Sequence, residues 1–265
     1  MKFTIAVIIA IAAIGGAVAA QQPPGQSGPS RLGPGYLENA APADSVALSP
    51  APPAIGSAAE ARDIEASKAA LTLKDGPRWS LATTDADLWR PDVTAAFSCA
   101  AGRDIGPRST PGVYKLLHKA TADLGLSTAA IKRKYQRSRP FMSNGQGTCT
   151  PDMEAALRKD GSYPSGHSAI GYGWGLILAE LLPERANPIV ARGRAFGDSR
   201  RICNAHWLSD AEEGRIAAAA VVARLHANSQ FRSDLEAARS ELAALEAKPP
   251  TRDCAAEAAA LALSQ

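Results

Sequence analysis

The chain has 265 residues, a length that fits one large domain or two small ones. Charged residues make up 21% and the hydrophobic set 46%, which excludes a disordered tail and a protein of many membrane spans. The net charge of +3 is too small to indicate a nucleic-acid binder. The charge is unevenly spread, because residues 101–150 hold nine basic and two acidic residues. This excess of positive charge predicts that residues 101–150 lie near a bound anion.

The N-terminus has the pattern of a secretory signal. Lys2 precedes a largely apolar run over residues 3–20 that ends in small residues. We therefore predict a signal peptide over residues 1–20. The alternative is a retained membrane anchor, but the run is short for a bilayer and has no charged stop.

Export also decides how the cysteines are interpreted. The chain has four, at Cys99, Cys149, Cys203 and Cys254. In an oxidising compartment this even set predicts two disulfides, with three connectivities left open. No pair has metal-ligand spacing, so we expect no metal site.

Helical patterns dominate the rest of the chain. Residues 21–56 are rich in proline, and we expect an extended segment that wraps around the domain or hangs free. Residues 57–250 show helical periodicity, and no run alternates as a strand would. Residues 251–265 are expected to form a tail. The predicted helices cover residues 58–73 (with Ala61, Ile64, Lys68 and Leu71 at helical spacing), 111–124, 128–138, 167–182, 185–196, 207–227 and 231–247.

The helix over 167–182 is apolar nearly all round, which predicts a buried central helix. Its most apolar part, residues 170–182, is too short to cross a bilayer. Gly171, Gly173 and Gly175 would let neighbouring backbones approach closely. The predicted fold is thus all-α, one helical bundle around this central helix.

Three short segments carry residue types that suit a phosphate group. In the first, Lys132 and Arg139 lie seven residues apart. Seven residues are two helical turns, so we expect both cations on one helical face, with Pro140 ending the helix beside them. The alternative is a solvated basic face.

The second segment, residues 163–167, precedes the central helix. A helix N-terminus offers unpaired N–H groups and a positive dipole end to an anion. Ser165 adds a hydroxyl, and Gly166 lets an anion approach the backbone. His167 lies in the first turn and faces whatever binds there; the alternative for it is a hydrogen-bonded core histidine.

The third segment contains Arg200, His206 and Asp210. If a helix begins near His206, the spacing of four places the Asp210 carboxylate beside the imidazole. There it can hold the Nδ1–H and leave Nε2 free to attack. The alternative is a His–Asp pair on the surface. Three segments with phosphate-binding residue types in one chain are, however, not explained by chance.

Together the three segments resemble the tripartite signature of the type 2 phosphatidic acid phosphatase superfamily, which also includes vanadium-dependent haloperoxidases. Their surroundings, such as Gly161-Ser162-Tyr163, make the chain similar to the class A bacterial non-specific acid phosphatases. The resemblance covers roughly residues 95–245. In this sequence the signature reads Lys132-x6-Arg139-Pro140, Pro164-Ser165-Gly166-His167 and Ser199-Arg200-x5-His206-x3-Asp210.

The resemblance implies an acid phosphatase that hydrolyses many phosphate monoesters, including nucleotides and sugar or aryl phosphates, through a phosphohistidine. The implied enzyme needs no metal or other cofactor, and phosphotransferase activity is implied as a further reaction. His206 is the implied nucleophile, His167 the general acid and Asp210 the residue that orients His206. The implied phosphate ligands are Lys132, Arg139, Ser165, Gly166 and Arg200.

The implied partners are small phosphate monoesters, with neither nucleic acid nor, after signal cleavage, a membrane. The implied location is the periplasm or the exterior, and relatives are often homo-oligomers. The two alternatives are a vanadate-dependent haloperoxidase and a non-catalytic phosphate-binding protein.

Two departures from the family pattern stand beside the motifs. Asp198 adds a carboxylate next to Arg200, which is expected to weaken phosphate affinity or shift the pH optimum. Asn204-Ala205 replaces a Gly-aromatic step, which is expected to widen the leaving-group pocket. Residues 101–150 contain seven basic residues that belong to none of the motifs. We expect these seven to form a basic rim around the phosphate site.

Overall fold

The computed structural model describes residues 33–37 and 45–264, so the predicted signal peptide lies outside the described residues. Within these ranges the chain forms helices and no β-strand, which confirms the all-α prediction. The α-helices are α1 (Ser45–Leu48), α2 (Ala58–Leu71), α3 (Pro77–Ala86), α4 (Ser98–Ala101), α5 (Pro111–Leu126), α6 (Ala129–Tyr135), α7 (Pro140–Asn144), α8 (Glu154–Leu157), α9 (Gly166–Leu181), α10 (Ala186–Ile202), α11 (Leu208–Leu225), α12 (Ser229–Ala244) and α13 (Cys254–Ala262), and the 3₁₀ turns are η1 (Val93–Phe97), η2 (Pro151–Met153) and η3 (Pro183–Arg185).

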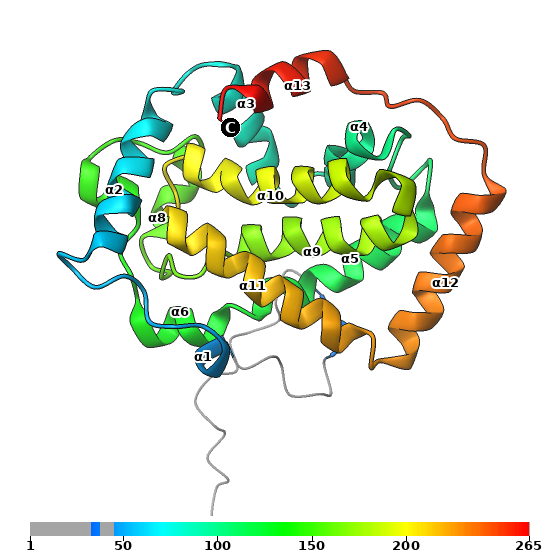
Figure 1. Ribbon diagram of the computed structural model, residues 1–265, viewed down its shortest axis with the longest axis horizontal. Helices are drawn as coiled ribbons and strands as arrows, with labels where there is room; N and C mark the ends of the chain where they lie inside the picture. Colours follow the sequence, from blue (N-terminus) through cyan, green and yellow to red (C-terminus); the bar gives the residue numbers. More distant parts are fainter. Residues whose placement is uncertain (1–32, 38–44, 265) are drawn as a thin grey trace, which may run out of the picture. The chain divides into compact units, whose positions relative to one another are not determined.

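Helix α9 lies at the centre, between α10 and α11, and α5 also packs against it (Figure 1). Trp174 of α9 is buried against Phe97 and Phe196, with ring centroids 6.3 and 5.9 Å away. A Cβ added to Gly193 of α10 would lie 2.8 Å from the backbone oxygen of Gly171. The prediction of a buried central helix with close backbone contacts is therefore confirmed.

Helix α5 shows how the periodic pattern becomes a core. Its predicted stripe, from Val113 to Leu124, is fully buried. The helix continues through Gly125 to Leu126, two residues beyond the predicted end. At its start the carboxylate of Glu241 on α12 accepts from the N–H groups of Gly112 and Val113 at 2.8 and 3.0 Å. This carboxylate satisfies donors that the first helical turn leaves unpaired.

The helix predicted over 128–138 is shorter than expected. It ends at Tyr135, because Gln136 takes a left-handed conformation with φ 44°. Arg139 then has extended backbone, as the following Pro140 requires. Lys132 and Arg139 therefore do not lie on one helical face, and that part of the prediction is wrong.

The buried face of α2 also differs from the prediction. Ile64 is exposed, whereas the buried side chains include Asp63 and Ser67. The face is polar because Asp63 binds groups near the start of α11, accepting from the backbone N–H of Ser209 at 2.8 Å.

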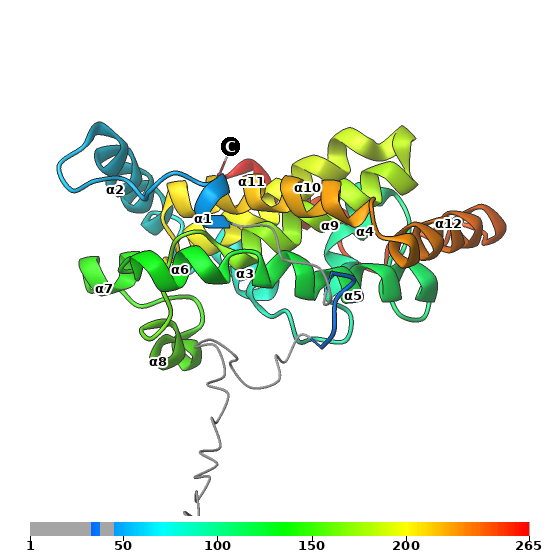
Figure 2. The same ribbon diagram turned by 90° about the horizontal axis from the view of Figure 1, so that it is seen from below.

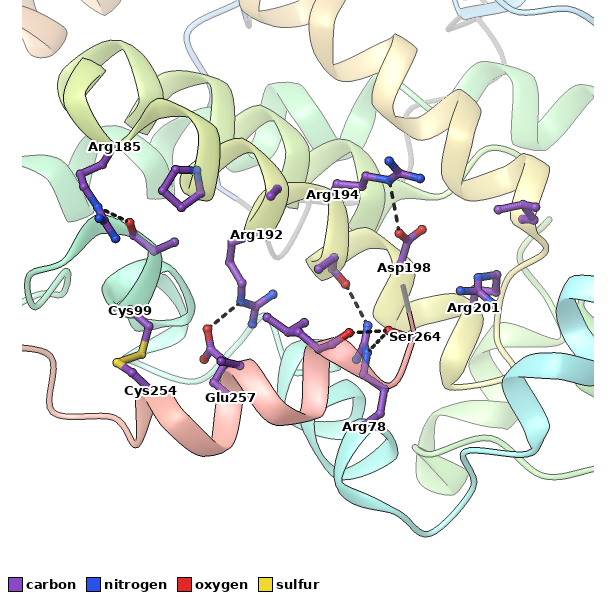
Figure 3. A pocket seen from close by; sticks show the side chains of 17 residues that line it. Arg78, Cys99, Arg185, Arg192, Arg194, Asp198, Arg201, Cys254, Glu257 and Ser264 are labelled. Atoms are coloured by element: carbon purple, nitrogen blue, oxygen red, sulfur yellow. Dashed lines mark hydrogen bonds and ion pairs between the residues drawn. A yellow bond between two sulfur atoms is a disulfide. The ribbon is translucent and has the colours of Figure 1, made fainter.

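The predicted tail contains helix α13, which lies along α3 and α10 (Figure 1). It borders a cavity of about 780 Å³, where Arg192 of α10 donates to Glu257 of α13 at 3.2 Å (Figure 3). The two disulfides, one of which fastens α13, settle the open connectivity: they are Cys99–Cys254 and Cys149–Cys203.

Two described parts of the proline-rich segment contact the domain. The backbone N–H groups of Tyr36 and Leu37 donate to Asp123 of α5 at 2.7 and 3.0 Å. The carbonyl of Pro50 accepts from the Tyr163 hydroxyl at 3.0 Å. The segment is therefore held against the domain at these two places. None of the described helices combines the length and apolar character that crossing a membrane requires.

Candidate active site

Six of the eight predicted site residues line one cavity of about 330 Å³. The walls of this cavity come from α6, the connection after α8, the start of α9 and the end of α10. Figure 2 shows α6 and α8 on the same side of the domain. Ser165 and Asp210 do not line it and are buried beside it. The six lining residues are Lys132, Arg139, Gly166, His167, Arg200 and His206.

Lys132 and Arg139 meet at a residue that the sequence did not single out, Asp160. Lys132 Nζ donates to Asp160 Oδ2 at 3.2 Å and to the carbonyl of Gly161. Arg139 Nη2 donates to the same Oδ2 at 3.0 Å. The two cations come from different segments, α6 and the extended turn before α7, and the 158–162 loop brings them together.

Arg200 completes a group of three cations. It is buried in the last turn of α10, where Nη1 contacts Cys203 Sγ at 3.6 Å and Nε has no hydrogen-bond partner among the described residues. Burial, and then the charge of Arg139, lower the pKa of Arg200 to about 9. The same two causes lower the pKa of Lys132 to about 8. An anion in the cavity would relieve this repulsion.

His206 and Asp210 form the predicted pair, with Nδ1 3.2 Å from Oδ2. Helix α11 begins at Leu208, so His206 lies just before it and Asp210 in its first turn. The same Oδ2 accepts from the N–H of Trp207 at 2.8 Å. Since a carboxylate accepts here, Nδ1 carries the proton, and the lone pair of Nε2 accepts from Arg139 Nη1 at 2.9 Å. Burial, and then Arg139 and other cations, hold the pKa of His206 well below its usual value.

Arg137, which the sequence placed in a basic rim, lies behind the pair instead. Its Nη1 donates to Asp210 Oδ1 and its Nη2 to Asp63 Oδ2, both at 2.7 Å. Burial raises the pKa of Asp210, and the charge of Arg137 acts against that rise. Residues 137–139 leave the helix extended, so alternate side chains point inward, and Ser138 between the two arginines is exposed. An earlier predicted helix end would have revealed this.

The start of α9 supplies the remaining predicted residues. Ser165 caps the helix, its Oγ accepting from the N–H of Ser168 at 3.2 Å. His167 has Nε2 2.9 Å from the carbonyl of Ala86, so Nε2 carries a proton and Nδ1 is the other nitrogen. Burial, followed by the charge of Arg200, holds the pKa of His167 well below its usual value.

The two departures from the family pattern have local explanations. Asp198 does not line this cavity; it pairs with Arg215 at 3.1 Å and lines the cavity beside α13, so its expected effect on phosphate is not supported by the geometry. Asn204 has φ 58°, a conformation that glycine adopts freely and asparagine tolerates. Its side-chain amide donates to the carbonyl of Gln146 at 2.9 Å.

Comparisons with known proteins agree with this arrangement. The PAP2 superfamily matches residues 115–234. A non-specific acid phosphatase of Providencia stuartii is 40% identical over 246 residues, 92% of this chain and 99% of that protein. An acid phosphatase of Zymomonas mobilis is 41% identical over 72% of each chain, and a non-specific acid phosphatase of Salmonella typhimurium is 41% identical over 73% of this chain and 78% of its own. The chain therefore belongs to the PAP2 superfamily and, within it, to the bacterial non-specific acid phosphatases.

Proposed function

We propose that this acid phosphatase hydrolyses phosphate monoesters through a phosphohistidine on His206. One observation carries the proposal: the imidazole of His206 shares a small cavity with three buried cations, Lys132, Arg139 and Arg200. Phosphoryl transfer chiefly requires positioning and neutralisation of the phosphoryl oxygens, which these cations can provide. The N–H of Gly166 at the start of α9 and the hydroxyl of Ser165 are further donors.

In the first step, Nε2 of His206 attacks phosphorus, and the bond from phosphorus to the ester oxygen breaks. The low pKa of His206 keeps the ring neutral. The Nε2 lone pair accepts from Arg139 Nη1 at 2.9 Å, so attack requires this N–H to turn to a phosphoryl oxygen when substrate binds. Asp210, held by Arg137, keeps the proton on Nδ1 and stabilises the positive charge that the ring gains.

His167 gives a proton to the departing ester oxygen. Burial, and then the positive charge of Arg200, oppose protonation of its ring. The negative charge of a bound phosphoryl group counters the effect of Arg200, so binding raises the pKa of His167. The Ala86 carbonyl accepts from Nε2 and leaves Nδ1 for proton transfer. Acidic conditions favour this charged ring, in keeping with an acid phosphatase.

In the second step, water attacks the phosphorus atom of the phosphohistidine. His167 accepts a proton from that water, the bond between phosphorus and Nε2 breaks, and phosphate leaves with His206 neutral again. An alcohol in place of water would give transfer of the phosphoryl group, the phosphotransferase reaction.

Broad specificity is part of the proposal, and nucleotides, sugar phosphates and aryl phosphates are the expected substrates. The cations contact only the phosphoryl end that all of these esters share. We also propose that the protein works in the periplasm or outside the cell, because both of its disulfides require an oxidising compartment.

The test is the turnover of p-nitrophenyl phosphate by His206→Ala in the presence of a chelator. We expect a loss of at least about 10³-fold, because the nucleophile is gone. His118→Ala, an exposed histidine on α5, is the matched control and should keep full activity. After quenching at alkaline pH, wild type should retain covalent phosphate and His206→Ala should not. Undiminished turnover by His206→Ala would refute the mechanism; halide oxidation with added vanadate, or phosphate binding without hydrolysis, would favour the two alternatives.

A further inference from the structure

We propose that Asp160 is an internal competitor for the phosphate site, an inference that rests on the proposed function. Its carboxylate holds two of the cations that bind the phosphoryl group. Substrate displaces it on entry, and it reclaims the cations as product phosphate leaves.

The geometry of the contacts carries this proposal. Lys132 Nζ and Arg139 Nη2 converge on one atom, Asp160 Oδ2, at 3.2 and 3.0 Å. Carboxylate and phosphate oxygens accept from the same donors in the same way, since both are anionic oxygens that suit an ammonium or a guanidinium group. A phosphoryl oxygen bound by both cations therefore takes over the bonds that Oδ2 makes.

Exposure decides which partner moves. The side chain of Asp160 is 55% exposed, against 10% for Lys132 and 1% for Arg139. A carboxylate at the cavity mouth can turn into water at little desolvation cost, whereas the cations are fixed inside. The competing group is therefore the one that is able to leave.

The loop does not depend on the carboxylate for its position. Arg139 Nε donates to the backbone carbonyls of Leu157 and Asp160 at 2.9 and 3.1 Å. Gly161 packs so closely that an added Cβ would lie 2.8 Å from the carbonyl oxygen of Lys132. These backbone contacts hold the loop when the side chain swings away, so a variant at Asp160 changes charge with little change in shape.

The consequence concerns the product. Three cations that bind the phosphoryl group of the substrate also bind inorganic phosphate, which would then block the site. A carboxylate on the neighbouring loop weakens the binding of both and returns to the cations when phosphate departs. Asp160 thus lowers the affinity of the site for phosphate and thereby speeds the release of product.

The test compares wild type with Asp160→Asn, and with Asp160→Ala as a second variant. The readouts are the competitive inhibition constant of inorganic phosphate and the KM for p-nitrophenyl phosphate, both at constant pH and ionic strength. We expect both constants to fall by roughly three- to tenfold in each variant, the size expected for losing a partly exposed pair of charge contacts. Asp152→Asn, which removes an exposed carboxylate outside the cavity, should leave both unchanged.

The opposite result is equally clear. If Asp160 serves only to position Lys132 and Arg139, both constants will rise in the variants, and the proposal is overturned. Unchanged constants overturn it as well. Calorimetric titration with inorganic phosphate measures the same difference without turnover, so a protein that binds phosphate but hydrolyses nothing would refute the proposed function while still testing Asp160.

Discussion

Removal of Arg137 should destabilise the protein far more than removal of an exposed arginine. Its guanidinium donates to both Asp63 and Asp210 at 2.7 Å, and both carboxylates are buried. In Arg137→Ala the two carboxylates lose their shared cation and stay out of water. Breaking a buried pair by removing one partner costs about 3–5 kcal/mol. For a domain of this size, such a loss lowers the melting temperature by roughly 6–20 °C.

A matched control is an exposed ion pair between α2 and α11, the two helices that carry Asp63 and Asp210. Arg62 of α2 pairs with Glu212 of α11, as Arg137 links Asp63 and Asp210, but these side chains are 59% and 38% exposed. An exposed pair contributes about 0–1 kcal/mol, so Arg62→Ala should have little effect. Urea unfolding of wild type and both variants gives the two free-energy differences.

Asp63→Asn in the Arg137→Ala background supplies the further check. It removes the negative charge of Asp63, one of the two carboxylates that lost their cation, and should recover part of the lost stability. Asp63→Asn alone should be destabilising. The reasoning is refuted if Arg137→Ala loses no more stability than Arg62→Ala. It is also refuted if the double variant shows simple additivity.

Two further predictions concern pH and backbone conformation. Burial and Arg139 lower the pKa of Lys132 to about 8, so its positive charge is present below that pH and lost as pH rises through it; the inhibition constant of phosphate should therefore rise between pH 7 and 9, and a flat profile would contradict the assignment. Asn204→Gly and Asn204→Ala both lose the side-chain hydrogen bonds of Asn204, but Asn204→Ala should lower the unfolding free energy by about 1–2 kcal/mol more than Asn204→Gly, because alanine resists φ 58°; equal unfolding free energies for the two variants would count against this account.

Periodic burial made the fold predictable. Residues from Val113 to Leu124 alternate at helical spacing because one face of α5 meets the core, and the apolar character of α9 reflects contact on all sides. Helix ends were harder to place. The end of α6 depends on Gln136, whose left-handed conformation no local pattern announces.

The candidate site shows the same division. The three motif cations Lys132, Arg139 and Arg200 line one cavity, although the helical-face argument for the first two was wrong. Asp160 and Asp63 escaped notice because their partners lie 21 or more residues away in the sequence, and only folding brings them together. A lone aspartate in a loop or on a helix has no periodic signature that reveals such a partner.

The two disulfides are nested, since Cys149 and Cys203 both lie between Cys99 and Cys254. Under the proposed export from the N-terminus, Cys99 and Cys149 would reach the oxidising compartment first, and oxidation in order of emergence would join these two. Native pairing therefore requires that α13 be delivered and docked before Cys99 reacts, or that an early bond be exchanged later. The last helix of the chain thus decides whether the first cysteine finds its partner.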